Sequence, residues 1–216
     1  MANKRIKRLE LRGQSKEEKS HKKVKYEQSS NSSSKKIRYK ETTKGLVIVY
    51  TGEGKGKTTA SLGLVLRAAG YKRKVLIVQF GKVWFTGELE GVKMLKPYVK
   101  IVQGGLGFVK IFDDNSKFSE HVKMANKTYD FLYKEVLSNK WDVVVADEIV
   151  GAVAGKLLKH GHIAKLIKDK PHKLDLILTG HHGKKSLFRL ADLVTEMMPI
   201  KHPFEKGFLA KPGVDY

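Results

Sequence analysis

Short apolar runs rich in β-branched residues alternate with helical patterns along most of the chain, and this alternation constrains the fold most strongly. Apolar residues at helical spacing mark residues 58–69 and 116–137, and a shorter helix includes residues 187–191. Continuous apolar strands separated by helices indicate an α/β fold, a three-layer sandwich with a mostly parallel central sheet. Ligands of such sheets bind at the carboxyl ends of the strands. The runs cover residues 46–50, 75–80, 99–103, 141–146, 174–179 and 193–197.

The first 44 residues differ in composition from the rest. They hold 15 Lys and Arg against 5 Asp and Glu, and the formal net charge of the whole chain is +21. Such a segment buries too little apolar surface to offset its chain entropy, so we expect residues 1–44 to be a basic, Ser-rich, disordered extension and residues 45–216 to form the folded domain. Nucleic acid would bind through this extension alone; the other interpretation is a solvated tail with no specific ligand.

Composition also excludes several kinds of site. The chain has no Cys, which excludes disulfides, thiolate metal sites and cysteine nucleophiles and fits a reducing compartment. No apolar run approaches the roughly 18 residues that a membrane-spanning helix needs, and no apolar stretch follows the basic N-terminus as in a secretory signal. These features predict a soluble, cytoplasmic protein with no membrane span.

A glycine-rich loop directly follows the first apolar run. Strand, glycine-rich loop, Gly-Lys-Thr and helix form the P-loop arrangement, in which backbone N–H groups and the positive end of the helix bind phosphate. Thr51 stands where the strict pattern has its first Gly. Lys57 would supply a cation and Thr58 a hydroxyl ligand for Mg²⁺. The residues expected to bind the nucleotide are Gly52, Glu53, Gly54, Lys55, Gly56, Lys57, Thr58 and Thr59.

A pair of carboxylates, Asp147 and Glu148, ends the fourth apolar run. The carboxyl ends of parallel strands meet at one edge of the sheet, so we expect these side chains to lie near the P-loop and to hold Mg²⁺ directly or through water. The alternative is an acidic pair at a helix N-terminus, stabilised by the helix dipole. The P-loop and the acidic strand end together predict an Mg-nucleotide site, but they do not say what happens to the nucleotide.

Several motifs in residues 45–216 resemble those of the cob(I)alamin (corrinoid) adenosyltransferases of the cobalamin-synthesis type. The P-loop is the first of them, and Arg67, Trp84 and the pair Gly87-Glu88 also fit. The resemblance implies a P-loop NTPase fold of the RecA-like kind and a homodimer. The other matching segments are residues 78–80, 147–148, 178–180, 191–197, 199–204 and 211–216.

The resemblance also implies an activity. The chain is expected to transfer the 5′-deoxyadenosyl group of ATP to the Co(I) of a reduced corrinoid, cobalamin or a precursor, with release of triphosphate and with a reduced flavoprotein as electron donor. Co(I) is itself a strong nucleophile, so the protein has to position the substrates and stabilise the departing triphosphate. Lys57, Thr58 and Glu148 are the residues expected to do this with Mg²⁺, and Arg67 is expected to contact the nucleotide.

Aromatic residues beside the corrinoid are implied to exclude an axial ligand while Co(II) is reduced. Phe108 matches one of them and is expected, with Trp84, to contact the corrinoid. The second aromatic of the family falls at Lys110, a departure for which Phe112 or Trp84 would compensate. His181 is another departure: it stands where the family commonly has Arg, and it retains hydrogen bonding without a permanent charge.

Two other functions stay open on the sequence alone. The positive charge suits a RecA-like ATPase that nucleic acid stimulates, although residues 45–216 show no recognisable nucleic-acid motif. The departures at Lys110 and His181 suit a non-catalytic protein that binds a corrinoid or ATP.

Overall fold

The structure, a computed structural model, describes residues 43–107, 109 and 116–216. These residues belong to one compact unit. Almost all of the extension predicted over residues 1–44 lies outside the described residues, and so do Phe108, Lys110 and Phe112.

Six strands form one sheet, and all of their pairings are parallel. The strand order is β3-β2-β4-β5-β1-β6. All six predicted strands are confirmed, with ends shifted by two residues at most. The strands are β1 (Val47–Thr51), β2 (Val75–Phe80), β3 (Val99–Gly104), β4 (Val143–Asp147), β5 (Asp175–Thr179) and β6 (Leu193–Glu196).

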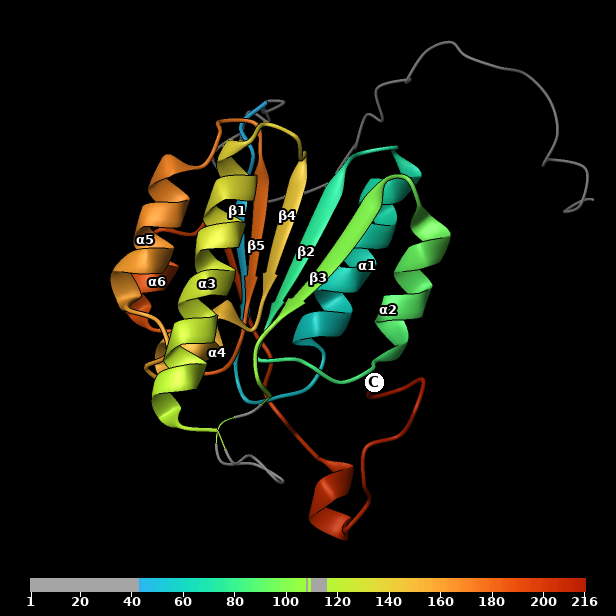
Figure 1. Ribbon diagram of the computed structural model, residues 1–216. Coiled ribbons are helices and arrows are strands. Elements are labelled where there is room, and N and C mark those ends of the chain that lie inside the picture. Colours follow the sequence, from blue (N-terminus) through green and yellow to red (C-terminus); the bar gives the residue numbers. More distant parts are fainter. Residues whose placement is uncertain (1–42, 108, 110–115) are drawn as a thin grey trace, which may run out of the picture. The chain divides into compact units, whose positions relative to one another are not determined.

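Helices cover both faces of this sheet, so the predicted three-layer α/β sandwich is confirmed (Figure 1). Figure 1 shows α1 and α2 on one face and α3 to α6 on the other. The helices are α1 (Lys57–Gly70), α2 (Gly87–Gly91), α3 (Phe118–Leu137), α4 (Ile149–Ala154), α5 (His160–Asp169) and α6 (Lys185–Phe188), with short 3₁₀ helices η2 (Val92–Leu95) and η3 (Pro203–Lys206).

Alternation along the strands builds two apolar cores. In β2, Leu76 and Val78 pack with α3 residues such as Leu132, whereas Ile77 packs with Val65 of α1. Successive side chains of a strand point to opposite faces, so a continuous apolar run is what a sheet covered twice requires. No helix within the described ranges has the length and apolar content needed to cross a membrane.

The strand order brings two loops to the same edge of the sheet. One strand, β5, separates β1, which leads into the P-loop, from β4, which ends in Asp147. Since all six strands are parallel, the carboxyl ends of β1, β2, β4 and β5 open on one side. The site is therefore built at this edge, as the rule for open parallel sheets predicts.

Candidate functional site

The P-loop joins β1 to α1 through two glycines that other residues could not readily replace. Gly52 has φ 97° and Gly56 has φ 108°, and both values lie in the left-handed region that favours glycine. The first helical hydrogen bond is donated by Ala60 N–H to the Gly56 carbonyl. Helix geometry leaves the backbone N–H groups before Ala60 without acceptors inside α1, so these groups can bind an anion.

Lys57 folds back into this loop. Its Nζ donates to the Gly52 carbonyl at 2.7 Å and to the Gly54 carbonyl at 2.8 Å. Burial lowers the pKa of the Lys57 ammonium, although the nearby carboxylates, Glu148 foremost, act to raise it. A buried cation is thus held at the centre of the loop by carbonyl dipoles, ready to exchange them for phosphate oxygens.

Asp147 is the central acceptor of the hydrogen bonds in the site, and it is fully buried. Its Oδ1 accepts hydrogen bonds from Thr58 Oγ1 at 3.0 Å and from Thr179 Oγ1 at 2.7 Å. Its Oδ2 accepts from Gln79 Nε2 at 3.2 Å and from Lys82 Nζ at 3.1 Å. Each oxygen has two donors, so the carboxylate uses all of its lone-pair sites and its orientation is fixed.

The donor set at the P-loop fits Mg²⁺. Thr58 Oγ1 and Asp147 Oδ1 lie 3.0 Å apart, close to the separation of adjacent oxygens around an octahedral ion with ligands at about 2.1 Å. Within the described residues, no group of three or more His, Asp or Glu could hold a metal by itself. Mg²⁺ needs no such group, because it is usually bound by one or two carboxylates together with water and substrate phosphates.

Glu148 turns away from the sheet into the site. Its backbone is left-handed, with φ 63°, and its N–H donates to Thr179 Oγ1 at 2.9 Å. Its carboxyl group lines an apolar pocket. Burial, and next the neighbouring Asp147 carboxylate, raise the pKa of Glu148 above its ordinary value. A buried carboxyl group with a raised pKa beside a second carboxylate lowers the stability of the fold when it is ionised, and such groups are typical of functional sites.

This raised pKa predicts a pH-dependent effect of Glu148→Gln in metal-free protein. The native state keeps the Glu148 proton to a higher pH than the unfolded state, so the unfolding free energy of the wild type falls as pH rises from the ordinary Glu pKa, about 4.3, to the raised value. The Gln variant lacks this loss. We expect it to be the more stable protein at pH 7 in urea unfolding with EDTA, and the advantage to vanish below about pH 4. Glu205→Gln, at an exposed position, should show no such trend, and an advantage for Glu148→Gln that is the same at every pH would contradict the prediction.

The turn after β5 is tied to the P-loop through Thr51. Thr51 Oγ1 donates to the Gly180 carbonyl at 2.9 Å and accepts from Gly183 N–H at 3.0 Å. The residue that departs from the strict P-loop pattern therefore fixes the neighbouring turn. In that turn, His181 Nδ1 lies 3.3 Å and His182 Nδ1 3.0 Å from the Glu53 carboxylate.

Gly180 makes this turn possible. It has φ 141°, and a Cβ atom there would lie 2.3 Å from the backbone nitrogen of Gly151 in α4. Since backbone cannot give way, Gly180→Ala is expected to lower the unfolding free energy by at least about 2 kcal/mol, measured by urea denaturation. Gly63→Ala is the matched control: a Cβ at Gly63, inside α1, meets nothing within 4 Å. The control should stabilise the protein by about 0.5–1 kcal/mol. A similar effect of both variants would show that the close approach to Gly151 does not matter.

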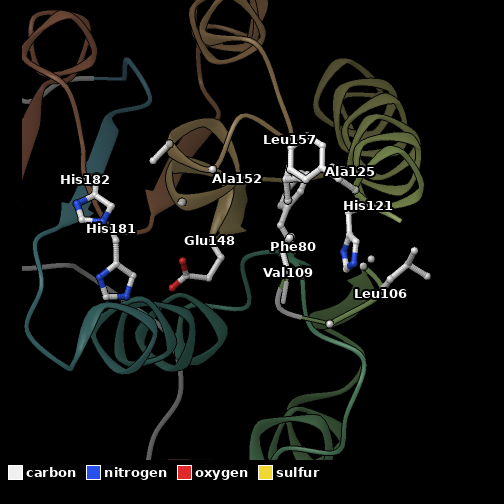
Figure 2. Close-up of a pocket in the computed structure, with 18 residues that line it drawn as sticks. Phe80, Leu106, Val109, His121, Ala125, Glu148, Ala152, Leu157, His181 and His182 are labelled. Atoms are coloured by element: carbon white, nitrogen blue, oxygen red, sulfur yellow. The ribbon is translucent and has the colours of Figure 1, made fainter. Parts of the chain in front are cut away.

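An apolar pocket of about 590 Å³ opens beside these groups. Figure 2 shows Glu148 and His181 on one side of it, and Phe80 and His121 on the other. Glycines and small or apolar side chains form most of the wall, and they include Gly81, Gly104, Gly105, Leu106, Gly107, Ala125, Gly151, Ala152, Gly155 and Leu157. The pocket thus offers a largely apolar surface, with Glu148, His181 and His182 on the P-loop side and His121 on the opposite side.

A second cavity, of about 1170 Å³, lies on the other side of residues 106–107, which line both cavities. It is bounded by Thr58 and Thr59 of α1, by Trp84, and by residues 213–216 near the C-terminus. An ion pair between Lys55 Nζ and Asp215 ties these last residues to the P-loop. Trp84 therefore lines the same cavity as the start of α1.

The structure brings most of the predicted residues together, but it keeps one apart. Arg67 is exposed in the last turn of α1 and lines a separate depression with Leu46 and Asp175. Ten residues of helix separate it from Lys57, or about 15 Å. Within one chain, Arg67 does not reach the nucleotide loop.

Several residues of the site were not assigned a role from the sequence. Gln79 and Thr179 fix Asp147, and Lys82 pairs with it. A signal was present in the sequence: each of the three lies at or just past the carboxyl end of an apolar run, where a polar residue is out of place unless it serves the site.

Comparisons with known proteins agree with this site. The profile of the family described as "ATP:corrinoid adenosyltransferase BtuR/CobO/CobP" matches residues 43–216. The corrinoid adenosyltransferase of Escherichia coli (strain K12) is 33% identical over 175 residues, which are 80% of this chain and 86% of the relative. A corrinoid adenosyltransferase of Sinorhizobium sp is 35% identical over 180 residues, 82% of this chain and 83% of the relative.

A solved structure, a KaiC-like protein from Pyrococcus horikoshii OT3, is also similar, with 16% identity and a TM-score of 0.47 over 71% of this chain and 72% of that one. Family membership does not depend on that likeness, because the family profile spans all of the described residues. The chain belongs to the ATP:corrinoid adenosyltransferase family.

Proposed function

We propose that this protein transfers the 5′-deoxyadenosyl group of ATP to the Co(I) of a reduced corrinoid and releases triphosphate, in cobalamin biosynthesis or salvage. One observation carries the proposal: a phosphate-binding loop and an apolar pocket meet at Glu148 and His181. Such a junction suits two substrates at once, a triphosphate in the loop and a large, flat, largely apolar ring system against the pocket wall. Family membership supports the same pair of substrates.

In this reaction the bonds that form and break lie within the two substrates, so the protein need not form a covalent bond itself. A bond forms between cobalt and C5′ of the ribose, the C5′–O5′ bond breaks, and its electron pair leaves on the triphosphate. Lys57 and the N–H groups at the start of α1 would stabilise that charge. Thr58 and Asp147, with Glu148 beside them, would hold Mg²⁺, which when bound supplies positive charge next to the triphosphate.

The apolar wall would orient the corrinoid and keep water from the reacting atoms. In the sequence, Phe108 stands between Leu106 and Val109, two residues that line the apolar pocket. This position supports the proposal that Phe108 contacts the corrinoid. Trp84, on the second cavity, is proposed as the other aromatic of the site.

The proposal extends to partners. The family resemblance supports a reduced flavoprotein as electron donor and a homodimer as the assembly, in the reducing cytoplasm that Co(I) chemistry requires. Exposed apolar side chains towards the C-terminus support a protein-binding surface: Ile200 is 100% exposed and Leu209 is 85% exposed.

An anaerobic assay tests the proposed function. Purified protein, Mg-ATP and chemically reduced cob(I)alamin are mixed, the change in corrinoid absorption is followed, and triphosphate is measured. We expect adenosylcobalamin and triphosphate to form in equal amounts. Repetition with incomplete corrinoids identifies the preferred substrate, and failure with all of them, while ATP still binds, would overturn the proposal in favour of a non-catalytic binding protein.

A further inference from the structure

Lys82 is a cation in the site that the P-loop pattern does not use. It follows β2 at the carboxyl edge of the sheet, just after Gly81, whose φ is 70°. Its side chain is 13% exposed, and its Nζ lies 3.1 Å from Asp147 Oδ2 and 3.5 Å from Glu88 Oε1. Two carboxylates therefore hold one ammonium group at the mouth of the site.

Lys82 lies close to the place where the triphosphate would bind. The Asp147 carboxylate bridges Lys82 Nζ and Thr58 Oγ1, so one carboxylate separates the ammonium group from the P-loop hydroxyl. Lys82 also lines the second cavity, together with Thr58 and Thr59. The side chain thus borders open space on the side from which a phosphate chain would approach the start of α1.

The ion pairs of Lys82 suit a state without nucleotide. With no nucleotide bound, the Asp147 and Glu88 carboxylates together hold the Lys82 ammonium group. Mg²⁺ bound at Thr58 and Asp147 Oδ1 would draw on the charge of the carboxylate whose Oδ2 pairs with Lys82, and so would weaken that ion pair. A triphosphate that binds together with Mg²⁺ brings new negative charge to the site. The flexible four-carbon stem of lysine lets the ammonium group of Lys82 move towards that charge.

We propose that Lys82 is a second triphosphate-binding residue, which moves from Asp147 and Glu88 to a phosphate oxygen when Mg²⁺ and nucleotide bind. This inference rests on the proposed function. As the C5′–O5′ bond breaks, its electron pair passes to the triphosphate, and Lys82 stabilises the added charge without giving or taking a proton. Lys57 acts from inside the loop and Lys82 from the facing strand end, so the leaving group lies between two cations.

Binding of inorganic triphosphate tests this directly, because it needs no turnover. Calorimetric titration in Mg²⁺ buffer compares the wild type with Lys82→Met, Lys82→Arg and the control Lys93→Met, where Lys93 pairs with Glu90 on the surface. Loss of a charge-assisted hydrogen bond predicts about 10–100-fold weaker binding by Lys82→Met. Lys82→Arg should recover most of the affinity, and Lys93→Met should bind as the wild type does.

A purely structural lysine would give another pattern. If Lys82→Met lowers the melting temperature but binds triphosphate as tightly as the wild type, the inference is wrong. Corrinoid binding, followed by absorption, should be unchanged in Lys82→Met, and an equal loss of both affinities would also overturn it. The adenosylation assay with the wild type is a separate readout: its failure, with the difference in triphosphate affinity intact, would reject the proposed function and leave the role of Lys82 standing.

Discussion

Lys57→Ala is expected to lower kcat/KM for ATP by at least about 10²–10³-fold, the size of effect seen when one preorganised donor to a developing charge is removed. Lys57 is 5% exposed as a residue, and two carbonyl groups, those of Gly52 and Gly54, direct its ammonium group into the loop. Alanine removes the cation that would meet the departing triphosphate. It also leaves two buried carbonyl oxygens without a donor. Adenosylcobalamin formation and triphosphate release should therefore fall together.

A control separates this effect from a general loss of positive charge. Lys127 is exposed on α3, far along the sequence from the loop, and Lys127→Ala should keep full activity. Lys57→Arg is a sharper comparison, because the planar guanidinium group does not match a space shaped by two carbonyls around a compact ammonium group. We expect it to be nearly as inactive as Lys57→Ala. Activity within a few fold of the wild type in Lys57→Ala would place the triphosphate outside this loop.

Asp147→Ala is expected to lower both stability and activity. The side chain is fully buried and accepts four hydrogen bonds, one of them from the ammonium group of Lys82. Its removal breaks a buried ion pair and leaves Lys82 with Glu88 alone, at 3.5 Å, and loss of one partner of a buried pair typically costs about 3–5 kcal/mol of unfolding free energy. Chemical denaturation measures this loss, and the adenosylation assay with folded protein should show no turnover. Asp130→Ala, at an exposed position of α3, should change stability by less than about 0.5 kcal/mol.

The double variant Asp147→Ala with Lys82→Met identifies the cause. If the Lys82 ammonium group, left with Glu88 alone, is responsible for the loss, its replacement by an apolar side chain of similar length should restore part of the stability. The two substitutions would then cost less together than separately. Strictly additive losses would show that the hydrogen bonds from Thr58, Thr179 and Gln79, and not the ion pair, make Asp147 important.

The strands were the part of the fold that the sequence predicted best, since their signal is strong and local. The run from Val75 to Phe80 is apolar except for Gln79, and the structure makes it β2 with the same ends. The helices between β4 and β5 were missed. In α5, Ile163 and Leu166 are the fully buried residues of a ten-residue helix, which is short for a clear periodic pattern, and α4 has only six residues. Helix α6 begins two residues and ends three residues earlier than predicted, because Ala191 packs on the core without continuing the helix.

The site was predictable where one continuous segment builds it. The P-loop residues are neighbours in sequence, and the glycines and Lys57 identify them. The hydrogen bonds from Gly183 N–H to Thr51 Oγ1 and from Lys82 Nζ to Asp147 join segments 132 and 65 residues apart. Such pairings depend on strand order, which the pattern of apolar runs does not specify. The prediction that Arg67 contacts the nucleotide came from the family resemblance alone. Within one chain, α1 carries Arg67 to a separate depression, away from the P-loop.

The position of β1 in the sheet has a consequence for the order in which the protein can be assembled during synthesis. β1 pairs with β5 and β6, whose residues lie about 130 to 145 positions later in the chain. A growing chain therefore carries an apolar strand with both edges open until residues 175–196 have left the ribosome, and non-local pairing of this kind is slow. The P-loop would be among the last parts to reach its final shape. Nucleotide binding would then report that synthesis has passed β6, and a product that ends before residue 175 would expose a strand prone to aggregation.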